Sequence, residues 1–298
     1  MNEHRLWNLA GEALAAIRTQ YEPVIERIIA ESGLDGWTWG LLLSAFTFEP
    51  ESTTPARLQI RGPYTAVEAY LARLSAAAGR GYLAEASPGE YRLTDAGRAG
   101  LERFIEEARA AMSQADPLPQ ADGARLAGLF DRLVQSSLRA LPPPEPRCIR
   151  LNYKLMPAVT PPLPYIEEAI SCLNAYRDDA HVAAWQPSGL SATALESLTL
   201  LWRGEADSLD AVCQRLAHRG HPPQVYAEAL AELRARGFIE GPEGTPHVTE
   251  AGRVFRDQVE ADTDRYFFAP WSDLDDAEKA ELADLLTRLR DGLKGKVP

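Results

Sequence analysis

The sequence predicts a mainly helical protein made of two tandem copies of one unit, in which three helices are followed by a short β-hairpin and a further helix. The chain has 298 residues, about twice the length of a typical domain, so two hydrophobic cores are expected. Short motifs recur along the chain at a nearly constant separation of 156 residues. A proline-rich stretch separates the two sets of motifs. Together these observations indicate an internal duplication.

The repeat is clearest where a helix is expected to end and a hairpin to begin. Arg80-Gly81-Tyr82-Leu83 recurs 156 residues later as Arg236-Gly237-Phe238-Ile239. The register then slips by one, because Leu93-Thr94-Asp95-Ala96-Gly97-Arg98 matches Val248-Thr249-Glu250-Ala251-Gly252-Arg253 at a separation of 155. A slip confined to a turn is typical of a duplicated domain with one variable loop.

The proline-rich stretch covers residues 141–163 and is interpreted as a linker. Its prolines are Pro142, Pro143, Pro144, Pro146, Pro157, Pro161 and Pro162. Proline at this density disfavours helix and favours an extended chain. The expected domains are therefore 1–140 and 164–298.

Capping residues and helix breakers place the elements of the second copy in order. Ser191 can cap a first helix and Ser208 a second, and Pro222 precedes a third. Gly237 ends the third helix, and a hairpin then leads to Thr249, which can cap a long fourth helix. The first copy shows the same order of signals, so residues 65–80 and 222–236 are expected to form equivalent helices.

This order is that of a winged helix-turn-helix. The chain resembles the MarR-type regulators over residues 33–140 and 189–293. The resemblance rests on this order of elements, on the glycine before Tyr82-Leu83 and on the Leu93–Arg98 motif. The long flanking helices expected outside the two copies are 4–32, 122–140, 164–186 and 275–293. Such helices build a homodimer in that family, so the resemblance implies a pseudo-dimer within one chain, with an approximate two-fold axis and a monomer in solution.

The resemblance implies that the third helix of each copy enters the major groove of DNA. In the first copy, this surface carries four arginines that are candidate DNA contacts: Arg57, Arg61, Arg73 and Arg80. In the second copy, four arginines are offset by Glu228 and Glu232. The net charge of −12 also divides unevenly, about −3 in residues 1–150 and −9 in 151–298. DNA contact is therefore expected to be local and stronger in the first copy.

The charges at the expected hairpin tips do not favour DNA binding. The first carries Glu85 and Glu90 with only Arg92, and the second carries no arginine. Both lack the Asp-x-Arg that MarR-type wings usually carry. A second hypothesis therefore stays open, in which the winged helices bind a ligand or a protein and have lost DNA binding.

Polar residues gather on one face of the helix expected before the second copy. Asn174, Asp178, His181 and Trp185 follow one another at spacings of four, three and four, and Arg177 lies beside them. These side chains could fix an organic ligand if the helix lies in the seam of the pseudo-dimer. The alternatives are a hydrogen-bond network that sets the packing of the halves, and a solvated face.

The segment from Tyr266 to Trp271 supplies aromatic residues for the expected wall of such a pocket. In MarR-type proteins, effectors lie between the flanking helices and the winged core, which favours these aromatics together with Trp185. The resulting hypothesis is a pocket for an aromatic or amphipathic small molecule, bounded by Tyr266, Trp271 and the face of the preceding helix.

The sequence contains none of the common catalytic or metal-binding motifs. The sequence lacks a glycine-rich phosphate loop, a nucleophile elbow and an HExxH motif. Its three cysteines have no CxxC spacing, and Cys213, His218 and His221 lack zinc-site spacing. The expectation is a non-enzymatic protein without a metal or cofactor.

The sequence also predicts a cytoplasmic protein. No run of residues approaches the roughly 18 apolar positions of a membrane span. The first 30 residues carry Glu3, Glu12, Glu22 and Glu26, which is not typical of a signal peptide.

Overall fold

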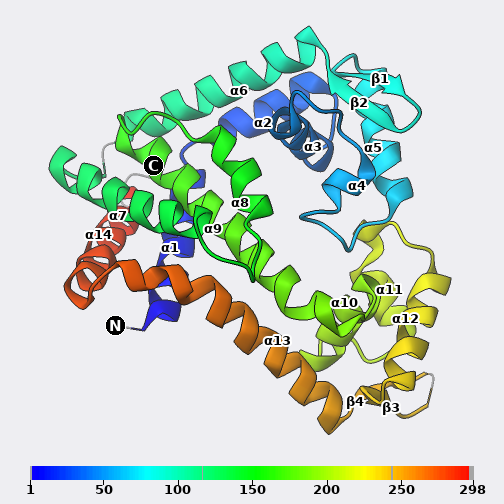
Figure 1. Cartoon of the computed structure of the whole chain (residues 1–298). Helices are drawn as coiled ribbons and strands as arrows, with labels where there is room; N and C mark the ends of the chain where they lie inside the picture. The colour runs from blue at the N-terminus through cyan, green and yellow to red at the C-terminus, as the bar shows by residue number, and fades with distance from the viewer. Residues whose placement is uncertain (1, 116, 243, 295–298) are drawn as a thin grey trace.

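A computed structural model describes residues 2–115, 117–242 and 244–294 of the chain. Within them the protein is mainly helical and contains two antiparallel two-stranded hairpins (Figure 1). The predicted class, mainly α with small β-hairpins, is confirmed. Across these residues, no helix combines the length and the apolar character that crossing a membrane requires.

The same order of elements occurs twice. In the first half it comprises α3 (Gly36–Phe48), α4 (Pro55–Leu58), α5 (Val67–Gly79), β1 (Leu83–Ser87), β2 (Glu90–Leu93) and α6 (Asp95–Gln114). In the second half it comprises α10 (Ala192–Trp202), α11 (Leu209–Arg215), η3 (Ala217–Arg219), α12 (Pro223–Ala235), β3 (Ile239–Glu240), β4 (His247–Val248) and α13 (Glu250–Phe268). Helices α5 and α12 lie where the equivalent helices were expected.

The junction between each hairpin and the next helix explains the repeated motif physically. The Thr94 hydroxyl accepts a hydrogen bond from the Gly97 amide at 2.9 Å and donates one to the Gly81 carbonyl at 2.6 Å. Thr249 makes the corresponding bonds, at 3.0 Å from the Gly252 amide and 2.6 Å to the Gly237 carbonyl. Each threonine thus caps a helix and ties its start to the end of the preceding one.

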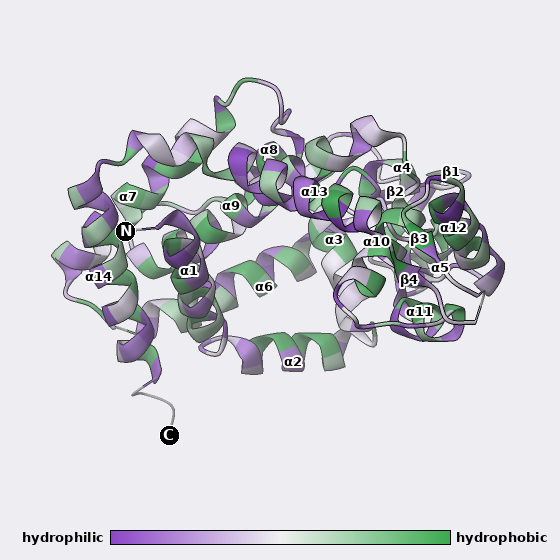
Figure 2. Cartoon of the chain, turned by 90° about the horizontal axis from the view of Figure 1, so that it is seen from below, coloured by the Kyte–Doolittle hydropathy of each residue, from purple (hydrophilic) through white to green (hydrophobic). Residues whose placement is uncertain are grey.

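Four further helices form a bundle at one end of the molecule, namely α1 (Glu3–Arg18), α7 (Gln120–Leu138), α9 (Pro162–Trp185) and α14 (Asp276–Lys294). Helix α2 (Glu22–Ser32) packs against α6 and buries Ile28 in the core of the first hairpin unit. Figure 2 shows α1, α7 and α14 at one end and both hairpins at the other. The single helix expected over 4–32 is two helices, because Pro23 in the first turn of α2 is compatible with a helix start and not with a helix interior.

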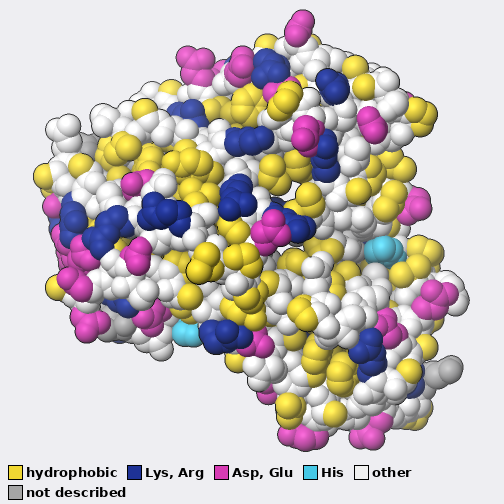
Figure 3. Space-filling model, in the orientation of Figure 1, with side chains coloured by type: hydrophobic (Ala, Val, Ile, Leu, Met, Phe, Trp, Pro, Cys, Tyr) yellow, Lys and Arg dark blue, Asp and Glu magenta, His cyan; other side chains and the backbone are white. Residues whose placement is uncertain are grey.

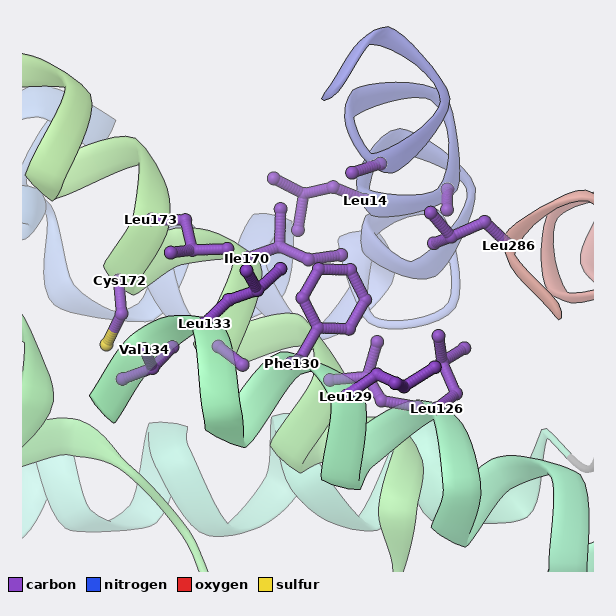
Figure 4. Packing of buried hydrophobic residues seen from close by; sticks show 14 of the residues in the cluster. Leu14, Leu126, Leu129, Phe130, Leu133, Val134, Ile170, Cys172, Leu173 and Leu286 are labelled. Atoms are coloured by element: carbon purple, nitrogen blue, oxygen red, sulfur yellow. The ribbon is translucent and has the colours of Figure 1, made fainter. Parts of the chain in front are cut away.

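Apolar side chains from several of these helices meet in the centre of the bundle. Phe130, Leu133 and Ile170 are fully buried there, beside Leu14 of α1 and Leu286 of α14 (Figure 4). Helix α1 packs against α14, and α9 packs against α7. The first and second halves of the chain therefore share one hydrophobic core in the bundle, whereas each hairpin unit has a core of its own.

Ion pairs between α7 and α14 connect positions that the repeat relates to each other. Arg125 pairs with Glu281 at 2.7 Å, and these two residues are 156 positions apart. Arg132 pairs with Glu278, while Arg288, which is 156 positions after Arg132, pairs with Asp122. The arginine of each half therefore pairs with the equivalent carboxylate position of the other half.

The segment 141–163 is only partly extended, so the expectation of a helix-free linker is wrong for its middle part. It contains α8 (Arg147–Asn152) and η1 (Tyr153–Leu155), because its prolines gather at the two ends. The Asp179 carboxylate of α9 accepts hydrogen bonds from the amides of Cys148 at 2.8 Å and Ile149 at 3.1 Å. These bonds hold the start of α8 on the bundle.

Candidate ligand cavity and nucleic-acid interface

A polar cavity of about 340 Å³ lies between α9, α10 and α13, and Tyr64 of the first half borders it. Four of the side chains predicted on α9 line it together: Asn174, Arg177, Asp178 and His181. They share one wall because residues three and four apart lie on the same face of a helix. The predicted constellation thus borders a cavity.

Each of three side chains on this wall is held by a partner from another element. The Arg177 guanidinium pairs with Asp264 at 2.9 Å, and the Asp178 carboxylate accepts a hydrogen bond from Arg61 Nε at 2.6 Å. The His181 Nδ1 atom lies 3.3 Å from the Thr263 hydroxyl. Burial lowers the pKa of His181 to about 4, so the imidazole is neutral near pH 7.

The opposite wall holds a buried arginine that sequence reasoning missed. Arg256 of α13 is 2% exposed, donates from Nε to the Thr199 hydroxyl at 2.9 Å and pairs with Glu260. Its Nη1 atom has no hydrogen-bond partner among the described residues. Buried charges are costly, so an arginine at this place calls for a role other than packing.

One signal in the sequence could have found Arg256. The buried face of α13 includes Gly252, Arg256, Val259, Thr263 and Phe267, so an arginine and a threonine stand at core spacing on an otherwise apolar stripe. The repeat reinforces the signal, because residue 101, which precedes 256 by 155 positions, is a leucine.

Replacing Arg256 by Leu and Glu260 by Ile together recreates the pair Leu101 and Ile105 of the first half. The double variant should be as stable as the wild type or more stable by about 1–4 kcal/mol, because apolar residues often replace a buried ion pair without loss. Urea denaturation followed by circular dichroism measures this difference. A loss of stability above about 2 kcal/mol would instead assign the pair a structural role, whereas Arg256→Leu alone leaves Glu260 without its partner and serves as the reference.

Three of the predicted ligand residues do not border this cavity. Trp185 is buried in the core of the second hairpin unit, with its ring 6.2 Å from that of Tyr64. Tyr266 and Trp271 lie in the bundle core, where Trp271 meets the ring of Trp7. The prediction that these aromatic residues form a wall of the cavity is therefore wrong. Helix α13 continues past Thr263 towards α1 and carries Tyr266 and Trp271 away from the cavity.

Residues 153–296 match the model of a helix-turn-helix family. The second half of the chain contains a helix-turn-helix domain. Its helices α11 and α12 are joined through η3, and its helices α10 and α13 line the polar cavity. No curated protein and no solved structure matches the chain. A helix-turn-helix domain indicates a DNA-binding regulator in general, with DNA as its partner.

The four arginines predicted to contact DNA in the first half lie in different surroundings. Arg73 stacks on Trp37 at 3.8 Å and pairs with Asp35 at 3.1 Å, and Arg80 is exposed at the end of α5. Arg57 pairs with Glu51. Arg61 pairs with Asp178 of α9 at 2.6 Å, and its side chain remains 49% exposed.

In the helix-turn-helix domain, the arginines near α12 bond within the domain. Arg234 donates to the Pro242 carbonyl at 3.1 Å, and Arg236 donates to the Gly189 carbonyl at 3.1 Å. Arg219 pairs with Glu196 at 2.6 Å. In Figure 3, basic side chains run in a row over the bundle, whereas the edge with both hairpins shows mostly uncharged, hydrophobic and acidic ones.

The start of α5 contacts the turn that precedes α12, so the two hairpin units touch each other. The Ala66 amide donates a hydrogen bond to the Arg219 carbonyl at 2.9 Å, and His221 Nε2 lies 2.9 Å from the Tyr64 carbonyl oxygen. A Cβ atom at Gly220 would lie 2.6 Å from the Ala69 Cβ atom. The side of the first turn of α5 that carries Ala69 therefore lies against the second hairpin unit, whereas Val67 and Glu68 of the same turn remain exposed.

Proposed function

We propose that this protein is a ligand-responsive, DNA-binding transcription regulator of MarR-like architecture. In this proposal, residues 1–140 and 164–298 are two winged-helix modules with their flanking helices, joined by the linker 141–163. The observation that carries it is the polar cavity, whose walls come from the flanking helix α9 and from α10 and α13 of the helix-turn-helix domain. A ligand there touches both the bundle and the domain that would meet DNA.

The pseudo-dimer is supported by the exchange of equivalent ion pairs between α7 and α14. In a two-fold interface, residue i contacts j of the partner and j contacts i of the partner. Arg132 with Glu278 and Arg288 with Asp122 follow this rule within one chain. The proposal therefore includes a monomer in solution, because the helices that would pair two subunits already pair with each other.

The chemistry of the cavity favours a small polar effector. Arginines and carboxylates both line it, and the neutral imidazole of His181 adds one donor and one acceptor. Tyr64 and Leu195 supply its apolar surface. We propose a molecule with both hydrogen-bond donors and acceptors, contacted by Asn174, Arg177 and His181.

DNA binding is tested by fluorescence anisotropy of the full chain with DNA from the region upstream of its own gene. Arg73→Ala and Arg80→Ala should each weaken binding and reduce the slope of log affinity against log salt by about one unit per lost phosphate contact, measured between about 50 and 200 mM salt. Arg265→Ala is the matched control, because this exposed arginine lies on α13 towards the bundle end. Equal losses in Arg234→Ala would contradict the expected dominance of the first module.

The alternative function is a ligand-binding or protein-binding module without DNA binding. The contact of the start of α5 with the second hairpin unit and the internally bonded Arg234 and Arg236 favour it. The absence of salt-dependent binding to any DNA, including when the two modules are separated by mutation, would select this alternative.

A further inference from the structure

Six exposed basic side chains lie on α7, α8 and η1, away from the candidate DNA interface. They are here called the basic row, and its members are Arg125, Arg132, Arg139, Arg147, Arg150 and Lys154. Figure 3 shows basic side chains in a row over this part of the bundle. Residues 120–163 carry six Lys or Arg against three Asp or Glu, a net charge of +3, whereas the whole chain carries −12. The basic row is therefore a local positive surface on an acidic protein.

The three arginines from α7 share one face of that helix. They are seven residues apart, so they follow one line over about 21 Å. Arg125 pairs with Glu281 and Arg132 with Glu278, whereas Arg139 forms no ion pair within the described residues. The repeat places Glu281 at the position equivalent to Arg125, so α14 does not carry the same stripe. The positive surface therefore occurs on one side of the bundle.

A hydrogen bond between side chains brings the end of α7 beside α8 and η1. Gln135 Nε2 donates to the Tyr153 hydroxyl at 2.9 Å, and Gln135 lies one turn before Arg139 on the same face. Arg150 and Lys154 lie one turn apart on either side of Tyr153. In the described parts of the chain, neither Arg150 nor Lys154 has a carboxylate within 4.0 Å, and the Lys154 ammonium donates to two backbone carbonyls. Cations without an acidic partner thus gather around Tyr153.

Exposed apolar side chains accompany these cations. The described residues include five large apolar side chains that are exposed, and three of these lie in the linker: Leu141, Tyr153 and Val159. Leu141 follows Arg139 by two residues and is 85% exposed. Exposed apolar side chains that lie together with charged ones are typical of a surface that a partner covers.

We propose that the basic row and Leu141 bind an acidic segment of a partner protein that also carries apolar side chains. Clusters of arginine recognise acidic peptide motifs, and charge complementarity guides the encounter. Leu141 favours a peptide over a nucleic acid, because a phosphate backbone offers no aliphatic side chain to cover it. An anionic membrane would also meet the acidic surface around the row, whereas a short peptide contacts the row alone.

This surface is separate from the proposed DNA-binding function. Figure 2 shows α7 at one end of the molecule and both hairpins at the other. The linker occurs once in the chain, so one peptide should bind per chain. The proposal therefore holds whether or not the hairpin units bind DNA.

The test is fluorescence anisotropy of the full chain with a labelled peptide made of glutamate, with leucine at every third or fourth position. A peptide of about 16 residues spans the row when it is helical. One peptide should bind per chain, and replacing its leucines by serine should weaken binding about 10-fold. The same peptide with lysine in place of glutamate should not bind.

Reversing two charges of the row tests which surface binds. Arg139→Glu combined with Arg150→Glu should weaken peptide binding about 10-fold or more, because two attractions become repulsions. Both residues are exposed and their side chains form no hydrogen bond in the described structure, so the fold should persist. Arg215→Glu with Arg253→Glu is the matched control. It makes the same change in net charge at exposed positions of the second hairpin unit and should leave peptide affinity unchanged.

Leu141→Ser separates the apolar contact from the charges. It should weaken binding of the leucine peptide about 3- to 10-fold and leave that of the serine peptide unchanged, because only the first loses a contact. Unchanged peptide affinity in the Arg139→Glu, Arg150→Glu variant would overturn the proposal. So would tighter binding of oligothymidylate or of phosphatidylglycerol vesicles than of the peptide, if that binding is lost in the same variant.

Discussion

Replacing Gly220 by Asn is expected to raise the affinity of the chain for DNA by about 10- to 100-fold. Gly220 has a φ angle of +76°, in the left-handed region where Asn is among the best tolerated residues after Gly. The local turn can therefore persist. The added Cβ atom would lie 2.6 Å from the Ala69 Cβ atom, so α5 and the turn before α12 must move apart.

The expected magnitude follows from the contacts that hold the modules together. They include the hydrogen bonds from Ala66 to Arg219 and between His221 and Tyr64, each worth about 1 kcal/mol. A contact of about 1–3 kcal/mol leaves the open form roughly 1–10% populated, and apparent affinity is reduced by that fraction. Removing the contact restores the lost affinity.

Gly204→Asn is the matched control for this experiment. Gly204 has a φ angle of +69° and no atom within 4 Å of an added Cβ, so the substitution has a similar backbone cost without separating the modules. Small-angle X-ray scattering should show a larger maximum dimension for Gly220→Asn only. If scattering shows opening while DNA affinity stays unchanged or falls, the contact between the two modules is not what limits binding.

The fold was accessible from the sequence because its signals are local. Thr94 and Thr249 each follow an expected hairpin and can cap the helix that begins after them, and a cap acts only on neighbouring residues. Pro23 also acts locally, and its effect on the helix expected over 4–32 could have been predicted. The helix α8 was not predicted because the prolines were counted over the whole segment 141–163. Residues 147–156 within this segment contain no proline and can form a helix.

In the candidate site, residues that lie on one helix could be predicted together, whereas residues from distant helices could not. Asn174, Arg177, Asp178 and His181 could be grouped in advance because one helix carries them at helical spacing. Arg256 belongs to a helix more than 70 residues later, and only tertiary packing brings it opposite His181. Trp271 was assigned to the wrong wall for the same reason, since aromatic composition does not show which neighbour a side chain meets.

Ion pairing was the hardest property to predict. Arg61 was placed on a DNA-facing surface by its position in the sequence, whereas the structure pairs it with Asp178 of the other half. Arginine side chains are long, so a count of charges near a helix does not show where each guanidinium lies.

The largest loss of stability is expected for Gly252→Ala and its counterpart Gly97→Ala. A Cβ atom at Gly252 would lie 2.1 Å from the Phe238 carbonyl oxygen, and one at Gly97 would lie 2.0 Å from that of Tyr82. Both contacts are with backbone atoms, so no rotation of a side chain relieves them. Each substitution should lower the free energy of unfolding by about 3 kcal/mol, at the upper end of the effects of overpacking.

Urea denaturation followed by circular dichroism measures both losses, with Gly128→Ala as the control. Gly128 lies within α7, where an added Cβ atom meets nothing within 4 Å, so alanine should stabilise the protein by roughly 0.5–1 kcal/mol. The two junction variants should behave alike, because each glycine lets the start of a helix approach the end of the preceding one. A large loss at one junction and none at the other would mean that the second motif is conserved in sequence but no longer needed by the fold, and would weaken the argument that the two halves are built alike.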